Sequence, residues 1–186
     1  RFNATGDGNV AIGNKALYCN NGSEPDFNVA IGRQAMYSTT TGTRNVAVGL
    51  NAMYLTTTGT CNIAMGANAL YNNTTGANNV AIGFEALACP NVGNTTAIGY
   101  KALKNNSDTG YSNTAVGYVA LAANTTGDFN TAVGREALET NASGSCNTAI
   151  GTKALEVITV DSGTAVGACA LAANTTGPAN TAVGRQ

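Results

Sequence analysis

The chain has 186 residues, of which only 10% are charged, and its formal net charge at neutral pH is −1. It contains no His, so it lacks the usual general base and the commonest metal ligand. It has no basic surplus of the kind that nucleic-acid binding requires, and no apolar run long enough to span a membrane. We therefore expect no enzyme, no cofactor, no metal site, no nucleic-acid partner and no membrane span.

One repeated unit runs from the first copy, which closes at Gly13, to the last, which closes at Gly184. The Gly that ends each Ala-(Ile/Val/Met)-Gly occurs eleven times, at intervals of 16 to 19 residues. The unit reads Asn-(Thr/Val)-Ala-(Ile/Val)-Gly-x-x-Ala-(Leu/Met)-x-x-Asn-Thr-Thr-Gly-x-x. A fixed period of this length is typical of stacked repeats. We predict that residues 1–186 form one repetitive rod, a window of a longer or polymerising chain.

Two Gly-centred turns in about 17 residues, together with β-branched runs, disfavour helix and favour an all-β fold. We predict a parallel β-solenoid, or β-roll, of about eleven coils. At ~4.8 Å per coil the rod would be ~50 Å long. A single coil buries too little apolar surface to offset its loss of backbone entropy, so contacts between coils must stabilise the stack.

The first arm of each unit, Asn-x-Ala-x-Gly, should alternate its side chains between two faces. The residue before Gly is apolar in every copy, so we place it in the core, where Asp in place of Val133 would unfold the coil. The predicted core residues are Ile12, Ile31, Val48, Met65, Ile82, Ile98, Val116, Val133, Ile150, Val166 and Val183.

The Ala before that apolar residue should then point the other way. An invariant small residue indicates that another backbone comes close, either the opposite side of a flattened coil or a neighbouring chain. We expect a neighbouring chain, so that Arg in place of Ala132 would disrupt assembly. The predicted inter-chain packing residues are Ala11, Ala30, Ala47, Ala64, Ala81, Ala97, Ala115, Ala132, Ala149, Ala165 and Ala182.

The second arm carries Ala-(Leu/Met), whose large residue we expect to pack against the Ile/Val of the first arm. Asn opens the first arm in nine of eleven copies, and stacked Asn amides can hydrogen-bond along a regular array. One position of the first four coils holds Tyr. We interpret this column as packing, with a ligand-binding stripe as the alternative. Its members are Tyr18, Tyr37, Tyr54 and Tyr71.

Asn-x-Ser/Thr, the N-glycosylation acceptor, occurs mainly in the Thr-Gly arm, whereas Asn-Thr-Ala of the first arm is no acceptor. We predict covalent N-glycans on this arm; the alternative is that Asn-Thr-Thr-Gly is only turn chemistry. The predicted glycosylation sites are Asn3, Asn21, Asn72, Asn73, Asn94, Asn105, Asn124, Asn141 and Asn174.

The five cysteines are too far apart along the stack for a disulfide framework within one chain. No two occupy the same position of adjacent coils. They are expected to be either buried and inert or bridged between chains. They are Cys19, Cys61, Cys89, Cys146 and Cys169.

The arm Asn-Thr-Ala-Val-Gly, and Asn-Val-Ala-Ile-Gly at 79–83, resembles the head repeats of trimeric autotransporter adhesins. Similar repeats occur in viral and phage fibre proteins. The resemblance covers the whole chain and implies a left-handed parallel β-roll, three chains wide, on a bacterial surface. A trimer is therefore what the resemblance implies.

These observations favour a structural subunit of an extracellular fibre or filament, located outside the cell or on a cell or virion surface. Its partner would be itself, through a lateral trimer, end-to-end stacking or both. One alternative is the shaft of an adhesin or viral tail fibre that projects a receptor-binding tip. A further alternative is an ice-binding solenoid with a two-column array of Thr39, Thr41, Thr56 and Thr58.

Overall fold

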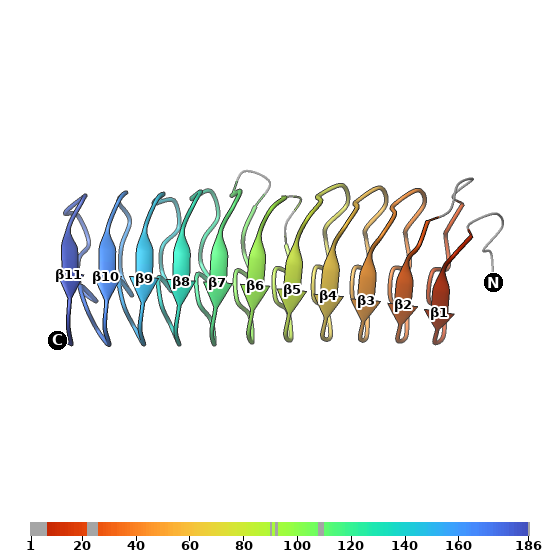
Figure 1. Cartoon of the computed structure of the whole chain (residues 1–186), viewed down its shortest axis with the longest axis horizontal. Helices are drawn as coiled ribbons and strands as arrows, with labels where there is room; N and C mark the ends of the chain where they lie inside the picture. The colour runs from red at the N-terminus through yellow and green to blue at the C-terminus, as the bar shows by residue number, and fades with distance from the viewer. Residues whose placement is uncertain (1–6, 22–25, 90, 92, 108–109, 186) are drawn as a thin grey trace.

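The computed structural model describes residues 7–21, 26–89, 91, 93–107 and 110–185. In this part of the chain eleven parallel strands form one sheet, in which each strand pairs with the next in sequence. About ten turns of the coil connect them, and the described residues contain no helix. The predicted all-β parallel solenoid is therefore confirmed (Figure 1). The strands are β1 (Val10–Ile12), β2 (Val29–Ile31), β3 (Val46–Val48), β4 (Ile63–Met65), β5 (Val80–Ile82), β6 (Thr96–Ile98), β7 (Thr114–Val116), β8 (Thr131–Val133), β9 (Thr148–Ile150), β10 (Thr164–Val166) and β11 (Thr181–Val183).

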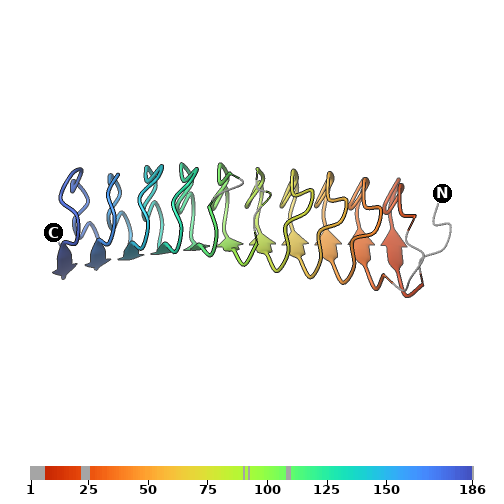
Figure 2. The same cartoon turned by 90° about the horizontal axis from the view of Figure 1, so that it is seen from above.

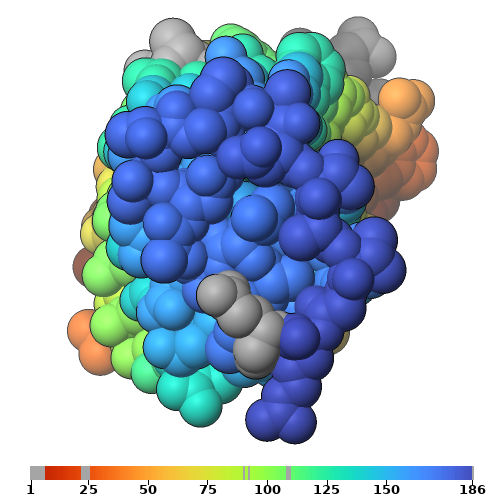
Figure 3. Space-filling view, turned by 90° about the vertical axis from the view of Figure 1, so that its left-hand side faces the viewer, coloured from red at the N-terminus to blue at the C-terminus, as the bar shows by residue number. Residues whose placement is uncertain are grey.

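All strand pairs share one register, in which each central Ala faces the central Ala of the next coil, as Ala132 faces Ala149. The strands lie along one long side of the rod and the remaining turns along the other (Figure 2). Seen along the rod, side chains fill the coil (Figure 3). The variable lengths of the units are taken up in the turns, so the register of the sheet is kept.

The inner face of the sheet carries the central Ala of each strand, not the residue before Gly. Ala132 is 0% exposed, whereas Val133 is 36% exposed. The predicted core is therefore wrong, because none of its members is buried: Ile12, Ile31, Val48, Met65, Ile82, Ile98, Val116, Val133, Ile150, Val166 and Val183.

The prediction of inter-chain packing residues is also wrong, because these residues form the core of their own chain. Nine are fully buried: Ala30, Ala47, Ala64, Ala81, Ala97, Ala115, Ala132, Ala149 and Ala165. Ala11 and Ala182, on the two outermost strands, are partly buried against the same cluster. The physical reason is the flatness of the coil. Its second arm lies so close to the strand that only a methyl group fits on the inner face.

The second arm supplies the large core side chains. Its Leu or Met is buried in nine coils, from Leu17 to Leu155, and packs with the inner Ala residues rather than with Ile/Val. These residues adopt left-handed backbone, as in Leu138 with φ 52°. Such φ values cost L-residues roughly 1–2 kcal/mol each. They curl the arm out of an extended conformation, which is why the arm forms no second sheet. Hydrogen bonds between coils still hold it, such as Leu138 N–H to Ala154 O at 3.1 Å.

The Gly that closes each strand touches the equivalent Gly of the next coil. Gly134 has φ +137°, and a Cβ added there would lie 2.5 Å from the carbonyl oxygen of Gly151. From Gly13 to Gly167 both the backbone conformation and the space therefore require glycine at this point, whereas at Gly184 only the backbone conformation does.

The predicted Asn ladder is present and buried. Asn130 donates from Nδ2 to Gly144 O at 2.8 Å, and its Oδ1 accepts from the Asn147 N–H at 2.9 Å. Most contacts of the ladder thus join an amide to backbone groups rather than to another amide. Where the first arm opens with Thr95 or Gly163, the Asn of the preceding coil still accepts from the backbone N–H. Each buried Asn of the ladder therefore hydrogen-bonds both within its own coil and to the next coil.

Candidate functional surfaces

The outer face of the sheet carries two parallel rows of side chains, called ranks below. Neither rank contains a charged residue. One rank is the residue before the inner Ala: Val or Ile from Val10 to Val80, then Thr from Thr96 to Thr181. The second rank consists of the Ile, Val and Met residues placed wrongly in the core. Several members of both ranks are clearly exposed, among them Ile12 at 59% and Met65 at 43%. An uncharged face of this kind, apolar in both ranks from β1 to β5 and in one rank from β6 to β11, is typical of an interaction surface.

Four predicted glycosylation sites lie on the surface of the coil. The side chains of Asn21, Asn72, Asn94 and Asn105 are exposed. The Nδ2 of Asn72 makes only one long contact, to Cys89 Sγ at 3.8 Å. At these four positions an attached glycan would point into solvent and leave the ladders intact. Whether they carry glycans stays a prediction.

Three other predicted sites are incompatible with the folded coil. Asn73, Asn124 and Asn141 are 0% exposed. Asn124 donates its Nδ2 to Asn106 Oδ1 at 2.7 Å and to Gly127 O at 3.0 Å. A glycan on this nitrogen would break both bonds and could not fit, so the prediction is wrong for these three residues.

The last two predicted sites differ from both groups. Asn174 is half-buried and donates its Nδ2 to Gly177 O at 2.9 Å, so it is a poor acceptor as well. Asn3 lies outside the described residues. At the buried sites Asn-Thr-Thr-Gly, or Asn-Ala-Ser-Gly at Asn141, is thus turn chemistry, in agreement with the alternative interpretation. The Asn closes its own turn by bonding the Gly carbonyl three residues on.

The proposed two-column Thr array does not exist. Thr39 and Thr56 are 0% exposed, whereas Thr41 and Thr58 are on the surface. The four residues therefore cannot form one face. Another regular Thr rank lies on the outer face of β6–β11.

Stacked aromatic rings form two columns on the surface of the rod. Tyr18, Tyr37, Tyr54 and Tyr71 stack with centroid distances of 5.1 to 5.2 Å, close to the spacing of the coils. The expected stacking of this column is confirmed. A second column, Phe84, Tyr100 and Tyr118, was missed, although each of its residues directly follows the closing Gly of three consecutive copies.

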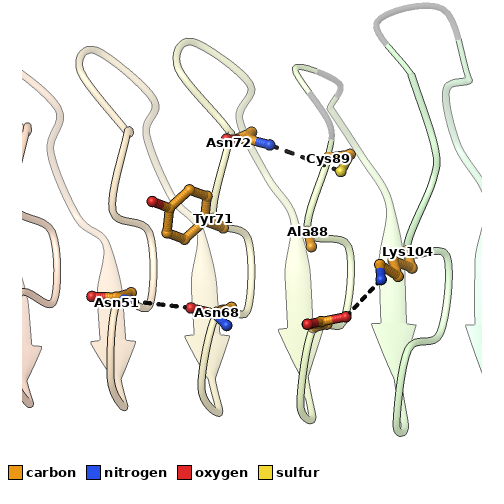
Figure 4. A pocket seen from close by; sticks show the side chains of 8 residues that line it. Asn51, Asn68, Tyr71, Asn72, Ala88, Cys89 and Lys104 are labelled. Carbon is orange, nitrogen blue, oxygen red and sulfur yellow. Dashed lines mark hydrogen bonds and ion pairs between the residues drawn. The ribbon is translucent and has the colours of Figure 1, made fainter.

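The first column ends beside a hollow of about 350 Å³. The fifth coil has Ala88 at the position of the Tyr residues, and the sixth has Lys104. Both line the hollow together with Tyr71, Asn68 and Glu85 (Figure 4). Lys104 Nζ lies 2.8 Å from a Glu85 carboxylate oxygen. The hollow thus lies where the Tyr column is interrupted, beside the buried Ala88.

The charges of the eighth and ninth coils form a network. Lys153 Nζ lies 2.8 Å from Glu156 and 3.3 Å from Glu136, which also pairs with Arg135. The hydrogen bond from Arg135 lowers the pKa of Glu136, whereas burial, followed by the charges of Glu136 and Glu156, raises the pKa of Glu139. The ion pair between Lys153 and Glu136 joins the ninth coil to the eighth.

All five cysteines are free thiols, and none is buried. Cys61, Cys89 and Cys146 are exposed, so the expectation of buried, inert thiols is wrong for them. Bridges to other chains stay a prediction.

No protein-family model, curated protein or solved structure matches the chain. The solenoid architecture therefore stands on the structure itself. Among the described residues, no helix has the length and apolarity needed to cross a membrane.

Proposed function

We propose that the chain is the structural subunit of an extracellular fibre, in which solenoid rods associate side by side through the outer face of the sheet. The observation that carries this proposal is the unbroken register of the coils. Backbone, Gly–Gly and Asn contacts all run along the rod axis, from each coil to the next. Each added coil repeats the same contacts, so length and stiffness grow with the number of repeats.

The outer face supports lateral association by its size and composition. Eleven coils at ~4.8 Å, with two ranks ~7 Å apart, give a ribbon on the order of 400 Å² per chain. Two such ribbons face to face would bury about 800 Å², the size of a small, weak interface, and contact among three chains would bury more. Ranks of Val, Ile and Thr without charge can interdigitate as the inner faces of stacked sheets do. Three chains around this face would match the adhesin resemblance.

The exposed acceptor sites support an extracellular position. Asn21, Asn72, Asn94 and Asn105 lie on turns rather than on the outer ranks of the sheet. Glycans there would surround the rod and leave the proposed contact face bare. They would also separate fibres whose low charge gives little mutual repulsion.

The test compares particle mass and length for the natural chain and two Arg variants. Light scattering and electron microscopy should show laterally associated rods for the natural chain. Val133→Arg places a charge in the outer ranks and should yield single rods. Thr126→Arg, on an exposed turn away from these ranks, is the matched control and should associate normally. Single rods for the natural chain at all concentrations would refute the proposed lateral contact.

A second candidate function is ice binding through the outer face of β6–β11. It is favoured by the rank of Thr96, Thr114, Thr131, Thr148, Thr164 and Thr181 beside a rank of Val and Ile. Hydroxyl and methyl groups repeated at the coil spacing can order water into a lattice. Thermal hysteresis that Thr148→Tyr abolishes would support this function, and no hysteresis would exclude it.

A further inference from the structure

We propose that the hollow between Tyr71 and Lys104 is a binding site for a small planar phenolic ring. The Tyr column sets the geometry of this site. Its rings follow one another at 5.1 to 5.2 Å, with angles of 7° to 15° between their planes. Ala88 continues this column without a ring. A guest ring in this space would stack on Tyr71 as Tyr71 stacks on Tyr54.

The far side of the hollow is bounded by Lys104, two coils beyond Tyr71. Two coil spacings amount to ~9.6 Å, but the Lys104 side chain reaches back across one of them, since its Nζ lies 2.8 Å from Glu85 of the intervening coil. A ring over Ala88 would therefore lie between Tyr71 and the Lys104 side chain. A cation over the open face of an aromatic ring is attractive. The same chain already uses this contact, since Lys101 Nζ lies 4.9 Å from the centre of the Tyr100 ring. Both walls of the hollow therefore favour an aromatic guest.

The rim of the hollow supplies polar partners for a hydroxyl group. The Glu85 carboxylate, held by Lys104 at 2.8 Å, can accept a phenolic O–H. Asn68 accepts at its Oδ1 from Asn51 Nδ2 at 3.2 Å, and its own Nδ2 points toward the coil of Glu85 and Ala88 (Figure 4). This nitrogen can donate to the same hydroxyl oxygen. The combination of an aromatic wall, a donor and an acceptor defines the ligand class.

A pair of probes of similar size tests planarity directly. We expect p-cresol to give a saturable shift of the Tyr71 and Ala88 amide signals in NMR titrations, with an affinity on the order of millimolar for so small a ligand. The saturated analogue 4-methylcyclohexanol has the same substituents on a puckered ring, and it should bind at least about tenfold more weakly, since it loses the stacking contact. Equal binding of both probes would overturn the proposal, as would the absence of a saturable shift with p-cresol.

Variants locate the site. Ala88→Tyr adds the missing ring to the column, so it should stay folded and lose p-cresol binding by at least about tenfold. Tyr71→Leu keeps an apolar side chain but removes the platform, and should cause a similar loss. Ala122→Tyr changes the same position two coils further along and should bind as the natural chain does. Undiminished binding by Ala88→Tyr would overturn the proposal. Failure of Ala88→Tyr to fold would also contradict it, because the slot would then have no room for a ring.

Discussion

The two faces of the sheet are built from adjacent residues, but they differ in how much the residue type varies from coil to coil. The inner face is Ala in all eleven strands, from Ala11 to Ala182, and nine of these residues are fully buried. The outer face holds Val, Ile, Thr and Met, and Thr replaces Val or Ile in one rank from β6 onward. Uniform residues mark the side where two backbones approach, and mixed residues mark the side that faces solvent.

The difference shows that residue size is a poor guide to burial in a flattened coil. A large core residue from the second arm, such as Leu138, fills most of the space and leaves only a methyl group for the strand. The hydrophobic ranks that look like a core are then left outside. They are available for contacts with other molecules, which is why the proposed lateral contact lies on them.

The largest expected effect comes from placing one residue type on the two faces in turn. Ala132→Arg would bury a charge without a partner in a fully packed coil, and should cost more than about 5 kcal/mol of unfolding free energy. Val133→Arg places the same charge in solvent and should change stability by less than about 1 kcal/mol. Thermal unfolding followed by circular dichroism measures both. If the two variants melted at the same temperature, the assignment of the faces would be wrong.

The sequence alone predicts the solenoid, its period, its parallel register and its Asn and Tyr ladders, because each depends on the repeat itself. It does not predict which face is inside. Alternation fixes that Ala132 and Val133 point in opposite directions, but not which direction is inward. That choice depends on the left-handed residues of the second arm, such as Glu136 and Leu138. Neither is a residue type that normally indicates such backbone.

The same limitation applies to the candidate sites, because the sequence does not show which of their side chains are exposed. Asn72 and Asn73 are neighbours with the same acceptor pattern, yet one is exposed and the other buried. The sequence also does not predict the hollow beside Tyr71. The interruption of the Tyr column does not indicate that Lys104 and Glu85 lie at the far side of the missing ring. Composition identifies the residues of these surfaces, but the path of each turn decides their exposure.

The next largest effect concerns the Gly at the edge between the two faces. Gly134→Ala forces an L-residue to φ +137° and brings its Cβ against Gly151 O. We expect a loss of roughly 3 kcal/mol, since both backbone strain and a steric clash contribute. Gly184→Ala is the matched comparison, because Gly184 has a similar φ of +130° but an added Cβ would meet no atom within 4 Å. An effect at Gly134 no larger than at Gly184, measured by urea unfolding, would contradict the close Gly–Gly contact.

A smaller loss should follow from breaking one rung of the buried ladder. Asn130→Ala removes two hydrogen bonds and leaves the Asn147 N–H unpaired, while Gly144 O keeps its hydrogen bond from Asn141 Nδ2, so the loss should be about 2 kcal/mol. Asn72→Ala is the matched control. Its side chain is exposed and makes only a long contact from Nδ2 to Cys89 Sγ at 3.8 Å, so we expect a change below about 0.5 kcal/mol. Hydrogen exchange of the Asn147 amide should accelerate in Asn130→Ala alone, and unchanged protection there would argue against the ladder.

The smallest expected effect lies at Glu139, on the border between the buried arm and solvent. Burial and the carboxylates of Glu136 and Glu156 raise its pKa above the ordinary value of 4.5. The folded state therefore binds the proton more tightly than the unfolded state, and stability falls as pH rises from about 4.5 through the raised pKa. Glu139→Gln removes this penalty. It should raise the melting temperature at pH 7 by roughly 1 °C and leave it unchanged near pH 4.

Glu136→Gln provides the opposite control, because Arg135 and Lys153 lower the pKa of Glu136. Its contribution is present above pH 4.5 and is lost as pH falls through the lowered pKa. This variant should therefore melt lower than the natural chain at pH 7, and the difference should shrink on acidification. If both variants shifted the melting temperature in the same direction at pH 7, the two carboxylates would share one environment. The boundary between the buried arm and the solvent-facing network would then lie elsewhere.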